Sequence, residues 1–461
     1  MADDSIPTGR LRRAAKVGRL AGGQAARSYA GRAADLTRSG EGRRSASERR
    51  QIEAAEQIFE VLGNMKGAAM KVGQLASFVD TGAFPPEFQE LIQQKLAELR
   101  DAAPRVSFER MRQVVEEDLG EPLDEAFSEF GEHAVAAASI GQVYRARLHD
   151  QREVAVKVQY PGVGQAVRAD LQNLGLIMRV AKRIAPGMDT KAMTREIRER
   201  LTDELDYEHE SQSHRAFARA WRGHPFIYVP PVITGLSGER VLVSEWVDGA
   251  GFEEVRELGA ATRDRFGEIV FRFFFGSLYR NGHFSGDPHP GNYKLMPDGR
   301  VAFLDFGMTK KLDRDQLDAE REAIRLGMAG DGSALHAQLA RMGFFDAGDE
   351  AVSPGAVLAH FRDITRWYIE DGEVTIDKSY AGRVLIDFGD PRSEHWELMK
   401  RETMPPASML ARRMEALTLG VLGQLGATAN WHRIAREWLF GDAPSTELGR
   451  REESFHLRAA A

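Results

Sequence analysis

Apolar residues recur every three or four positions over a long segment in the first quarter of the chain, which predicts a helix with one core-facing side. The residues of this pattern are Ile52, Ala55, Phe59, Leu62, Met65, Ala69, Val72 and Ala76. Amphipathic patterns over 88–99 and 107–119 predict two further helices, the second with Ser107 at its N-cap. We therefore expect a helical extension over residues 51–128.

The pattern changes to short strand-like runs from about residue 129. Apolar runs over 140–146 and 154–158 flank a turn at His149, which predicts a strand–turn–strand unit. Runs over 228–232 and 240–247 are expected to close a small antiparallel sheet. Residues 129–248 are therefore predicted to form a small sheet domain, with helices inserted at 167–184 and 190–221.

Helical patterns dominate the rest of the chain. The segment 263–280 holds a dense apolar run, which predicts a buried core helix. Helices resume near Asp313, so residues 249–440 are expected to form a helical domain, and the polar residues 441–461 are expected to form a tail. The predicted fold class is α+β, with a small antiparallel sheet, a helical domain and a helical N-terminal extension.

Two acidic motifs separated by a hairpin are the main chemical signal. Asp287 precedes Asn292 by five positions, and an Asp-Phe-Gly triplet begins at Asp305. The strand-like runs between them flank a Pro-Asp-Gly turn, so a tight hairpin would bring Asn292 close to Asp305. Carboxylate and amide oxygens are suited to Mg²⁺ with bridging phosphates. The alternative is a capped loop followed by a buried strand.

A lysine lies inside one of the apolar strands. Lys157 is costly in that position unless it is paired or used. The acidic cluster over 203–210 offers partners: Asp206 and Glu210 would share a face of a regular helix, while Glu204 would point roughly opposite to Asp206. An ordinary solvated acidic face is the alternative. The strand over 240–247 leads into a glycine-containing connector, where a purine could contact backbone groups near Glu245 and Val247.

The composition limits the classes of function. The chain has 461 residues, 43% of them hydrophobic, enough for one large core or two adjacent ones. The absence of cysteine excludes disulfides, thiolate zinc sites and cysteine nucleophiles. The net charge of -7 argues against general nucleic-acid binding. We find no run of ~18 apolar residues and no signal peptide, so we expect a cytoplasmic protein, with any membrane contact peripheral on the inner face.

The N-terminal segment differs from this acidic average. Residues 1–50 hold twelve Lys or Arg and five Asp or Glu, a net charge of +7, so the rest of the chain sums to -14. A basic stripe runs beside a face of mostly alanine and glycine, and such a helix can lie on an anionic membrane surface. A disordered basic arm, or a helix docked on the acidic remainder of the chain, fits this composition equally well.

One further pair lies on the first predicted helix. Lys71 and Gln74 are three positions apart and therefore neighbours on its surface. Small residues around them would let another backbone or a phosphate approach closely. On these grounds alone, a solvated lysine beside a glutamine is the commoner explanation.

Together these motifs resemble the UbiB (AarF) family of atypical, protein-kinase-like proteins. The resemblance covers roughly residues 50–440 and rests on KVGQ (71–74), AAASIGQV (136–143), VAVK (154–157), ELD (204–206), DPHPGN (287–292) and DFG (305–307). It implies a bilobal kinase-like fold, binding of ATP and Mg²⁺, and a role in isoprenoid quinone or other lipid metabolism at a membrane.

The resemblance also implies residue roles. Lys71 and Gln74 would face Glu204 and Asp206, which leaves Glu210 to pair with Lys157. An alanine-rich loop of Ala136, Ala137 and Ala138 would replace the kinase glycine-rich loop, with Ser139 contacting a phosphate. In the kinase layout Lys157 would hold the ATP phosphates, Asn292 and Asp305 would hold Mg²⁺, and Asp287 would be the base or the group that positions water.

The expected function is therefore that of a Mg²⁺-dependent ATPase or atypical kinase acting for a lipid pathway. No long activation segment and no Ala-Pro-Glu triplet follow Gly307. The resemblance also implies that the helix with Lys71 and Gln74 folds across the place where a kinase receives a peptide. A conventional protein kinase is therefore not expected. The alternatives are a small-molecule phosphotransferase and a nucleotide-gated lipid-binding module that transfers no phosphate.

Overall fold

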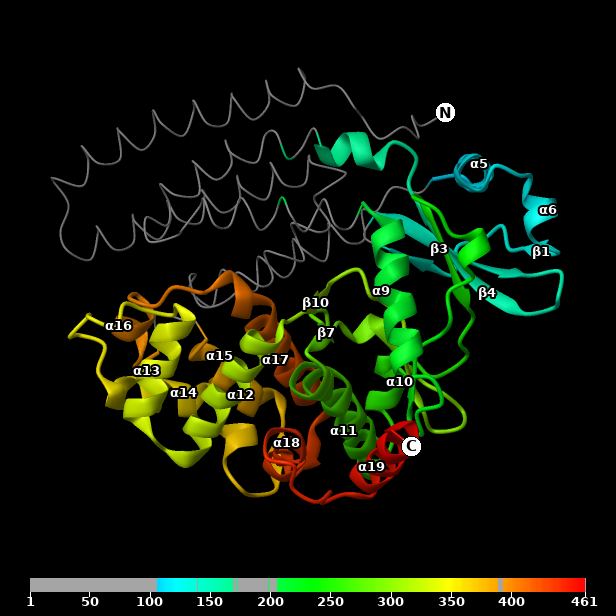
Figure 1. The fold of residues 1–461 in the computed structure, drawn as a ribbon. Helices are drawn as coiled ribbons and strands as arrows, with labels where there is room; N and C mark the ends of the chain where they lie inside the picture. The colour runs from blue at the N-terminus through cyan, green and yellow to red at the C-terminus, as the bar shows by residue number, and fades with distance from the viewer. Residues whose placement is uncertain are drawn as a thin grey trace, which may run out of the picture. The chain divides into compact units, whose positions relative to one another are not determined.

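The computed structural model describes residues 106–138, 140–168, 171, 198, 205–388 and 393–460 (Figure 1). These residues belong to two compact units, which are described separately. The first holds the described residues up to Glu208 together with Ile233–Val243, and the second holds His209–Val232 and the chain from Ser244 onward. The predicted basic arm and the predicted site residues Lys71, Gln74, Ser139 and Glu204 lie outside the described residues.

The first unit is built on an antiparallel sheet, as predicted. Its strands are β1 (Glu129–Phe130), β2 (Ala136–Ala137), β3 (Gly141–Arg147), β4 (Glu153–Gln159) and β6 (Val241–Glu245), in the order β1-β3-β4-β6 with β2 also paired to β3. Alternate residues of β4 face the core: Val154, Val156 and Val158 are fully buried. Lys157 points to the opposite face of the pleat, where it pairs in register with Val143 of β3.

Helix α5 (Phe108–Leu119) confirms the helix predicted over 107–119, and a short helix α6 (Leu123–Ala126) follows it. Met111, Val114 and Val115 form the buried face of α5. Ser107 occupies the N-cap position, but its side chain makes no capping hydrogen bond. The helix is attached instead by Asp118, whose Oδ2 accepts hydrogen bonds from the backbone N–H groups of Arg240 (2.9 Å) and Val241 (3.0 Å).

Two secondary-structure predictions in this region are wrong, one for a helix and one for a strand. The helix predicted over 190–221 is not continuous, because residues 205 and 206 are not helical. Helix α9 (Tyr207–Ala220) begins only at Tyr207, so Asp206 precedes the helix and the argument that it shares a helical face with Glu210 fails. Just before α9, the backbone carbonyl of Leu205 accepts a hydrogen bond from Nε2 of Gln159 in β4 (2.9 Å).

Strand β5 (Ile227–Tyr228) does not join the small antiparallel sheet. It pairs in parallel with β9 (Val301–Phe303) of the second unit, because Phe226 and Ile227 are buried in that unit's core. An antiparallel bridge between Val232 and Ser244 is retained.

The second unit is mainly helical, as predicted. Its core helix α11 (Ala260–Gly276) lies against α17 (Pro406–Leu425) and α18 (Trp431–Leu439) (Figure 1). It also contacts β12 (Ala427–Ala429). Phe271 and Phe275 of α11 are fully buried, and a Cβ at Gly267 would lie 2.7 Å from Cβ of Ala427, so this close approach requires glycine. The other helices among the described residues are η1 (Thr234–Leu236, in the first unit), α10 (Phe252–Arg256), the π-helical turn η2 (Ser277–Asn281), η3 (Pro290–Asn292), α12 (Arg314–Ala329), α13 (Gly332–Met342), α14 (Pro354–Ile369), α15 (Lys378–Ile386), α16 (Trp396–Met399) and α19 (Glu447–Ala460).

Short strands complete the second unit. A three-stranded sheet runs in the order β5-β9-β8, with β8 at Tyr293–Leu295. Two-stranded sheets join β7 (His283–Ser285) to β10 (Thr309–Lys311) and β11 (Val374–Ile376) to β12 (Ala427–Ala429).

The C-terminal segment, expected as a polar tail, is instead the helix α19. Its Leu448 and Glu452 are buried. Oε2 of Glu452 lies 2.8 Å from Nη1 of Arg272 on α11, and that guanidinium is itself fully buried. A mostly polar sequence therefore docks through an internal ion pair together with the buried Leu448.

Candidate active site

The hairpin between the two acidic motifs is present as predicted. Strands β8 and β9 pair in register from Tyr293↔Phe303 to Leu295↔Val301, and Gly299 closes the turn with φ +81°. At the open end, the backbone N–H of Leu304 donates to the carbonyl of Asn292 (2.9 Å). The hairpin thus brings Asn292 next to the residue that precedes Asp305.

Asp287 and Asn292 form a direct contact. Nδ2 of Asn292 donates to Oδ2 and to the backbone carbonyl of Asp287, each at 3.3 Å. The short helix η3 between them is held by the buried Tyr293, whose hydroxyl donates to the carbonyl of Pro288 (2.7 Å). Because the amide nitrogen is directed to Asp287, Oδ1 is the atom that Asn292 can offer to a cation.

The Asp305 loop is anchored by its phenylalanine. Phe306 is fully buried, with ring centroids of His214 and Phe217 on α9 at 4.7 and 4.8 Å. The backbone N–H of Gly307 donates to Oδ1 of Asp305 (3.0 Å), which fixes one carboxylate oxygen.

The Asp305 loop is also tied to the chain that carries Asp287. Strands β7 and β10 pair with Ser285 opposite Thr309, and the N–H of Gly286 donates to the carbonyl of Met308 (2.8 Å). The two acidic motifs therefore belong to one rigid piece of backbone.

Glu210 lies beside this loop. Its side chain is buried, and a Cβ built at Gly307 would lie 3.5 Å from Oε2 of Glu210 and 3.4 Å from Oδ1 of Asp305. One turn along α9, Oγ1 of Thr309 donates to Oγ of Ser213 (3.1 Å). The structure thus places a third carboxylate near the Asp305 loop, a donor set suited to a hard cation.

A positively charged residue that the sequence analysis missed also reaches the site. Nη2 of Arg413 on α17 lies 3.7 Å from Oδ1 of Asp287, and its Nη1 donates to Sδ of Met308 (2.8 Å). The side chains of Arg413 and Asp287 are 11% and 17% exposed, so this charge contact is shielded from bulk water. No motif marks Arg413, because its approach depends on how α17 packs.

Helix α17 is fixed against the site at its start. Nζ of Lys310 donates to the carbonyls of Pro406 (2.8 Å) and Ala407 (2.7 Å). Leu410 fills the space beside Gly286, where a Cβ would overlap its side chain. The segment after Asp305-Phe306-Gly307 is therefore held by the C-terminal helices.

In the first unit, Lys157 lies over an aromatic ring. Its Nζ is 5.0 Å from the ring centroid of the buried Tyr207, a cation–π distance. Lys157 and Glu210 belong to different units, so their pairing stays a prediction. Asp206 is exposed, and its contact with Lys71 likewise stays a prediction.

Ala136 and Ala137 of the alanine-rich segment form strand β2, so this part is not an open loop. Ala136 and Ala137 are exposed and pair with Val143 and Gln142 of β3. The N–H of Ala138 donates to the carbonyl of Gly141 (2.9 Å). The backbone here is thus held by the sheet, without the conformational range that glycines would add.

The segment expected to meet a purine has several internal bonds. The N–H of Glu245 donates to the carbonyl of Pro231 (3.0 Å), and its Oε1 accepts from the hydroxyl of Tyr228 (2.8 Å). The carbonyl of Val247 accepts from Nζ of Lys294 (3.3 Å). A purine edge would therefore have to contact other backbone groups of this segment.

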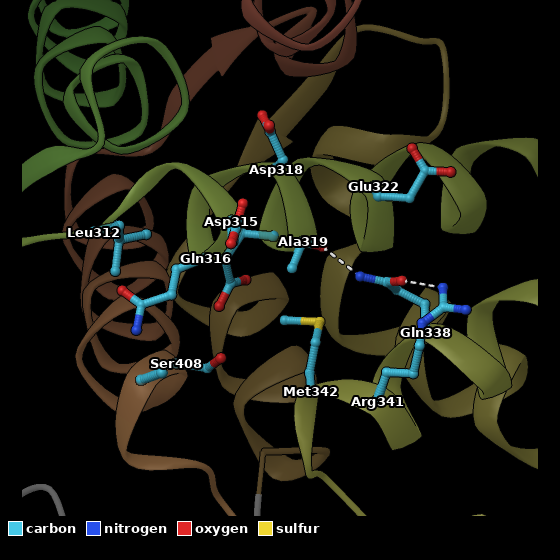
Figure 2. A pocket seen from close by; sticks show the side chains of 12 residues that line it. Leu312, Asp315, Gln316, Asp318, Ala319, Glu322, Gln338, Arg341, Met342 and Ser408 are labelled. Carbon is cyan, nitrogen blue, oxygen red and sulfur yellow. Dashed lines mark hydrogen bonds between the residues drawn. The ribbon is translucent and has the colours of Figure 1, made fainter.

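A cavity of about 550 Å³ lies elsewhere in the second unit, between α12, α13 and the start of α17 (Figure 2). Acidic side chains that line it include Asp315, Asp318 and Glu322. At one end, Nε2 of Gln338 donates to the carbonyl of Ala319 (3.1 Å), and Arg341 donates to Gln338. None of the predicted site residues lines this cavity.

A family model described as the ABC1 atypical kinase-like domain matches residues 98–337, which include Lys157, Glu210 and both acidic motifs. The chain belongs to the ABC1 atypical kinase-like family. This confirms the predicted UbiB/AarF membership and the α+β kinase-like fold class. The match ends before α17, so Arg413 lies outside the part that the family model covers.

Members of this family resemble the chain over much of its length. An uncharacterized chloroplastic aarF domain-containing protein kinase of Arabidopsis thaliana is 31% identical over 412 residues, covering 85% of this chain and 56% of that protein. The mitochondrial atypical kinase COQ8B of Rattus norvegicus is 30% identical over 278 residues, covering 60% of this chain and 52% of that protein. The chain thus spans about half the length of these relatives.

A solved structure agrees with this chain in fold. The complex structure of Rv3197 with erythromycin from Mycobacterium tuberculosis superposes with a TM-score of 0.60 at 33% identity, covering 84% of this chain and 96% of that one. Within the part of the chain that the structure describes, no helix is both long and apolar enough to cross a membrane.

Proposed function

We propose that this member of the ABC1 family is a Mg²⁺-dependent ATPase or atypical kinase whose reaction centre lies at the end of the β8–β9 hairpin. The observation that carries the proposal is the grouping of Asp287, Asn292 and the Asp305 loop on one piece of backbone, with Glu210 beside it. These groups supply the oxygen ligands and the base-like carboxylate that phosphoryl transfer requires.

Each residue has a stated role in this proposal. Asn292, through Oδ1, and Asp305 would hold Mg²⁺, which neutralises charge on the phosphates of ATP when bound. Asp287 would orient water or accept the proton of an acceptor hydroxyl, since the hydrogen bond from Asn292 and the charge of Arg413 keep its carboxylate in place. Lys157 would hold the phosphates, and Glu210 would orient Lys157.

The nucleotide would also contact the first unit and the segment after β6. Ala136, Ala137, Ala138 and Ser139 would lie along the phosphates, and backbone groups near Glu245 and Val247 would meet the purine. We assign the regulatory role to Lys71 and Gln74, facing Glu204 and Asp206, in a helical extension that covers the position of a peptide substrate. Generic protein substrates are therefore not expected to be phosphorylated.

The acceptor in this proposal belongs to a lipid pathway, such as a membrane lipid or an isoprenoid quinone precursor. The support is the family membership together with the net charge of +7 over residues 1–50, which suits an anionic membrane surface. The protein would act from the cytoplasmic side as a peripheral protein. The alternative is that ATP controls lipid binding and no phosphate is transferred to the lipid. In that case ATP turnover would yield no phosphorylated product.

A second candidate is binding or phosphorylation of a small molecule. The relative from Mycobacterium tuberculosis is described as a complex with erythromycin, and the cavity of about 550 Å³ in Figure 2 falls in the size range of small-molecule pockets. In that case a phosphorylated small molecule, rather than inorganic phosphate or a lipid, would be the product.

The test is ATP turnover by the purified 461-residue chain, with and without vesicles of anionic phospholipid, followed by mass spectrometry of all products. We expect Mg²⁺-dependent phosphate release that anionic vesicles increase and that Asp305→Asn abolishes, because the substitution removes the charged ligand. Asp298→Asn is the matched control: it makes the same chemical change at the exposed turn of the same hairpin.

Deletion of residues 1–40 should remove the vesicle effect, and that effect should weaken at high salt because surface charges are then screened. Turnover by Asp305→Asn equal to that of Asp298→Asn would show that the metal assignment is wrong. Robust phosphorylation of unrelated proteins by the intact chain would contradict the proposal that the helical extension covers the position of a peptide substrate.

A further inference from the structure

A second group of metal-ligating side chains lies in the second unit, on elements that carry none of the kinase-like motifs. His360 and Asp363 are three positions apart on α14 and project from the same helical face. Glu394 and His395 belong to the segment that leads into α16. A ligand atom is offered by each of Asp363, Glu394 and His395, and these three atoms lie within 4.8 Å of one another.

The imidazole of His395 is held in place from several sides. Its Nε2 lies 2.7 Å from Oδ2 of Asp363, and its ring is 5.0 Å from that of His360 at an interplanar angle of 33°. The backbone N–H of His395 donates to Oγ of Ser393 (3.1 Å), whose hydroxyl donates to Oδ1 of Asp387 (2.6 Å). The segment before α16 therefore presents His395 to Asp363 in one fixed orientation.

His360 supports this arrangement without being needed as a ligand. Its Nδ1 lies 3.2 Å from Oε1 of Glu402, and its Nε2 lies 2.8 Å from the carbonyl of Asp387. Both ring nitrogens are thus engaged, and the ring acts as a wall against which His395 packs. Surrounding groups of this kind normally fix the orientation of a metal-binding histidine.

Burial and charge separate this group from an ordinary surface cluster. The side chain of His395 is 10% exposed and that of Asp363 is 31% exposed, whereas Glu394 is exposed. Two carboxylates thus lie beside an almost buried imidazole, and a neutral imidazole does not balance their negative charge. A divalent cation would neutralise both carboxylates at once, and Glu394 could adjust its rotamer from the solvent side.

We propose that Asp363, Glu394 and His395 bind one divalent transition-metal ion. Ligand atoms about 2.0–2.2 Å from Zn²⁺ stand about 3.3 Å apart in a tetrahedral site. That spacing lies between the 2.7 Å contact of His395 with Asp363 and the 4.8 Å limit for the whole group. Nε2 of His395 would bind the ion in the neutral tautomer that carries its proton on Nδ1, and a water molecule would complete the coordination.

The donor set indicates the class of metal. An imidazole nitrogen with two carboxylates suits Zn²⁺, Co²⁺ or Mn²⁺, whereas Mg²⁺ prefers oxygen ligands alone. A bound ion would tie α14 to the segment before α16 and so stabilise that part of the second unit. The inferred site shares no residue with Asp287, Asn292 or Asp305, so it is independent of the proposed enzymatic function.

The test uses the 461-residue chain, stripped of metal with a chelator and titrated with Zn²⁺ in the absence of nucleotide. We expect one equivalent to bind by calorimetry and by metal analysis after dialysis, with a rise in melting temperature. His395→Gln, Asp363→Asn and Glu394→Gln should each weaken Zn²⁺ binding about tenfold or more. Because Glu394 is exposed, Glu394→Gln should not disturb folding, so weaker Zn²⁺ binding in this variant would come from the lost ligand.

Two controls should keep the wild-type Zn²⁺ affinity. Glu397→Gln makes the same change at an exposed glutamate of α16, and Asp305→Asn removes the proposed Mg²⁺ ligand. Co²⁺ in place of Zn²⁺ should add visible absorption bands that disappear in His395→Gln. Failure to bind one equivalent of Zn²⁺, or equal affinity in the three ligand variants and the wild type, would mean that the group is only an internal ion pair.

Discussion

The most severe stability effect is expected at Arg272, the residue through which α11 holds α18 and α19. Its guanidinium is fully buried and touches three carboxylates: Nε lies 2.7 Å from Glu268, and Nη1 lies 2.8 Å from both Glu437 and Glu452. Nη2 also donates to Oγ1 of Thr446 (2.9 Å). Substitution by methionine would fill much of the volume but leave these acids without their cation.

The magnitude follows from the acids that would remain. The side chains of Glu437 and Glu452 are 3% and 1% exposed. Burial by itself would raise the pKa of the Glu452 carboxyl, but the nearby His456 and the charge of Arg272 outweigh it and lower that pKa from 4.5 to about 2. At about 1.4 kcal/mol per pKa unit, a shift of this size corresponds to roughly 3 kcal/mol of stability, of which His456 supplies one part and the charge of Arg272 another.

The shift also sets the pH dependence. A carboxyl whose pKa is lowered by folding adds stability above its unfolded pKa, and this is lost as the pH falls toward its folded pKa. For Glu452 the window lies between 4.5 and about 2. In Arg272→Met the remaining acids would be easier to protonate, so the difference from wild type should be largest near neutral pH and shrink below about pH 4.5.

We therefore expect Arg272→Met to reduce the free energy of unfolding of the second unit by about 3–5 kcal/mol, the usual cost of breaking a buried ion pair. Urea titration followed by tryptophan fluorescence would measure it, since the Trp438 ring lies 5.9 Å from the Arg272 guanidinium. Hydrogen exchange should show loss of protection in α19. The triple variant Arg272→Met, Glu437→Gln, Glu452→Gln should recover part of the stability, because it removes two of the acids as well.

Arg436→Met is the matched control for this experiment. Arg436 pairs with Asp442 at 2.6 Å, but their side chains are 33% and 42% exposed, so its loss should cost no more than about 1 kcal/mol. A loss below about 1 kcal/mol for Arg272→Met at neutral pH, or a difference that grows on acidification, would refute the reasoning.

Two further predictions concern the candidate active site. Lys157→Met should weaken ATP binding, and Glu210→Gln should weaken it less, because the lysine would remain but lose its orientation; equilibrium binding of labelled ATP measures both, and unchanged affinity in Lys157→Met would exclude its phosphate role. Arg413→Met should lower turnover and move the acidic limb of its pH profile upward, because Asp287 would lose a positive neighbour that favours its charged form. Arg413→Lys should restore part of both effects, and an unchanged pH profile in Arg413→Met would count against its action through Asp287.

The acidic motifs show how far local sequence reasoning reaches. The turn residues between β8 and β9 and the alternation of their apolar positions were enough to predict the hairpin, and the hairpin brings Asn292 next to the Asp305 loop. The run of phenylalanines in α11 likewise predicted a buried helix. In both cases the information lies within a few adjacent residues, at the spacing that defines a strand or a helix.

Other features depended on partners far away along the chain. Strand β5 left the predicted antiparallel sheet because Val301, more than seventy residues later, offers it a parallel neighbour. The polar segment 447–460 folds as α19 because α11 supplies a buried arginine for Glu452. Neither outcome is visible in the local pattern of apolar and polar residues.

The sequence by itself thus determined the β8–β9 hairpin, the buried helix α11, the two acidic motifs and the family resemblance, since these depend on residue spacing within single elements. Only the tertiary structure decided that Arg413 lies 3.7 Å from Asp287 and that Asp363 meets His395 at 2.7 Å. The physical reason is that a charge contact is governed by distance in space, and the packing of whole helices, not the local sequence, sets that distance.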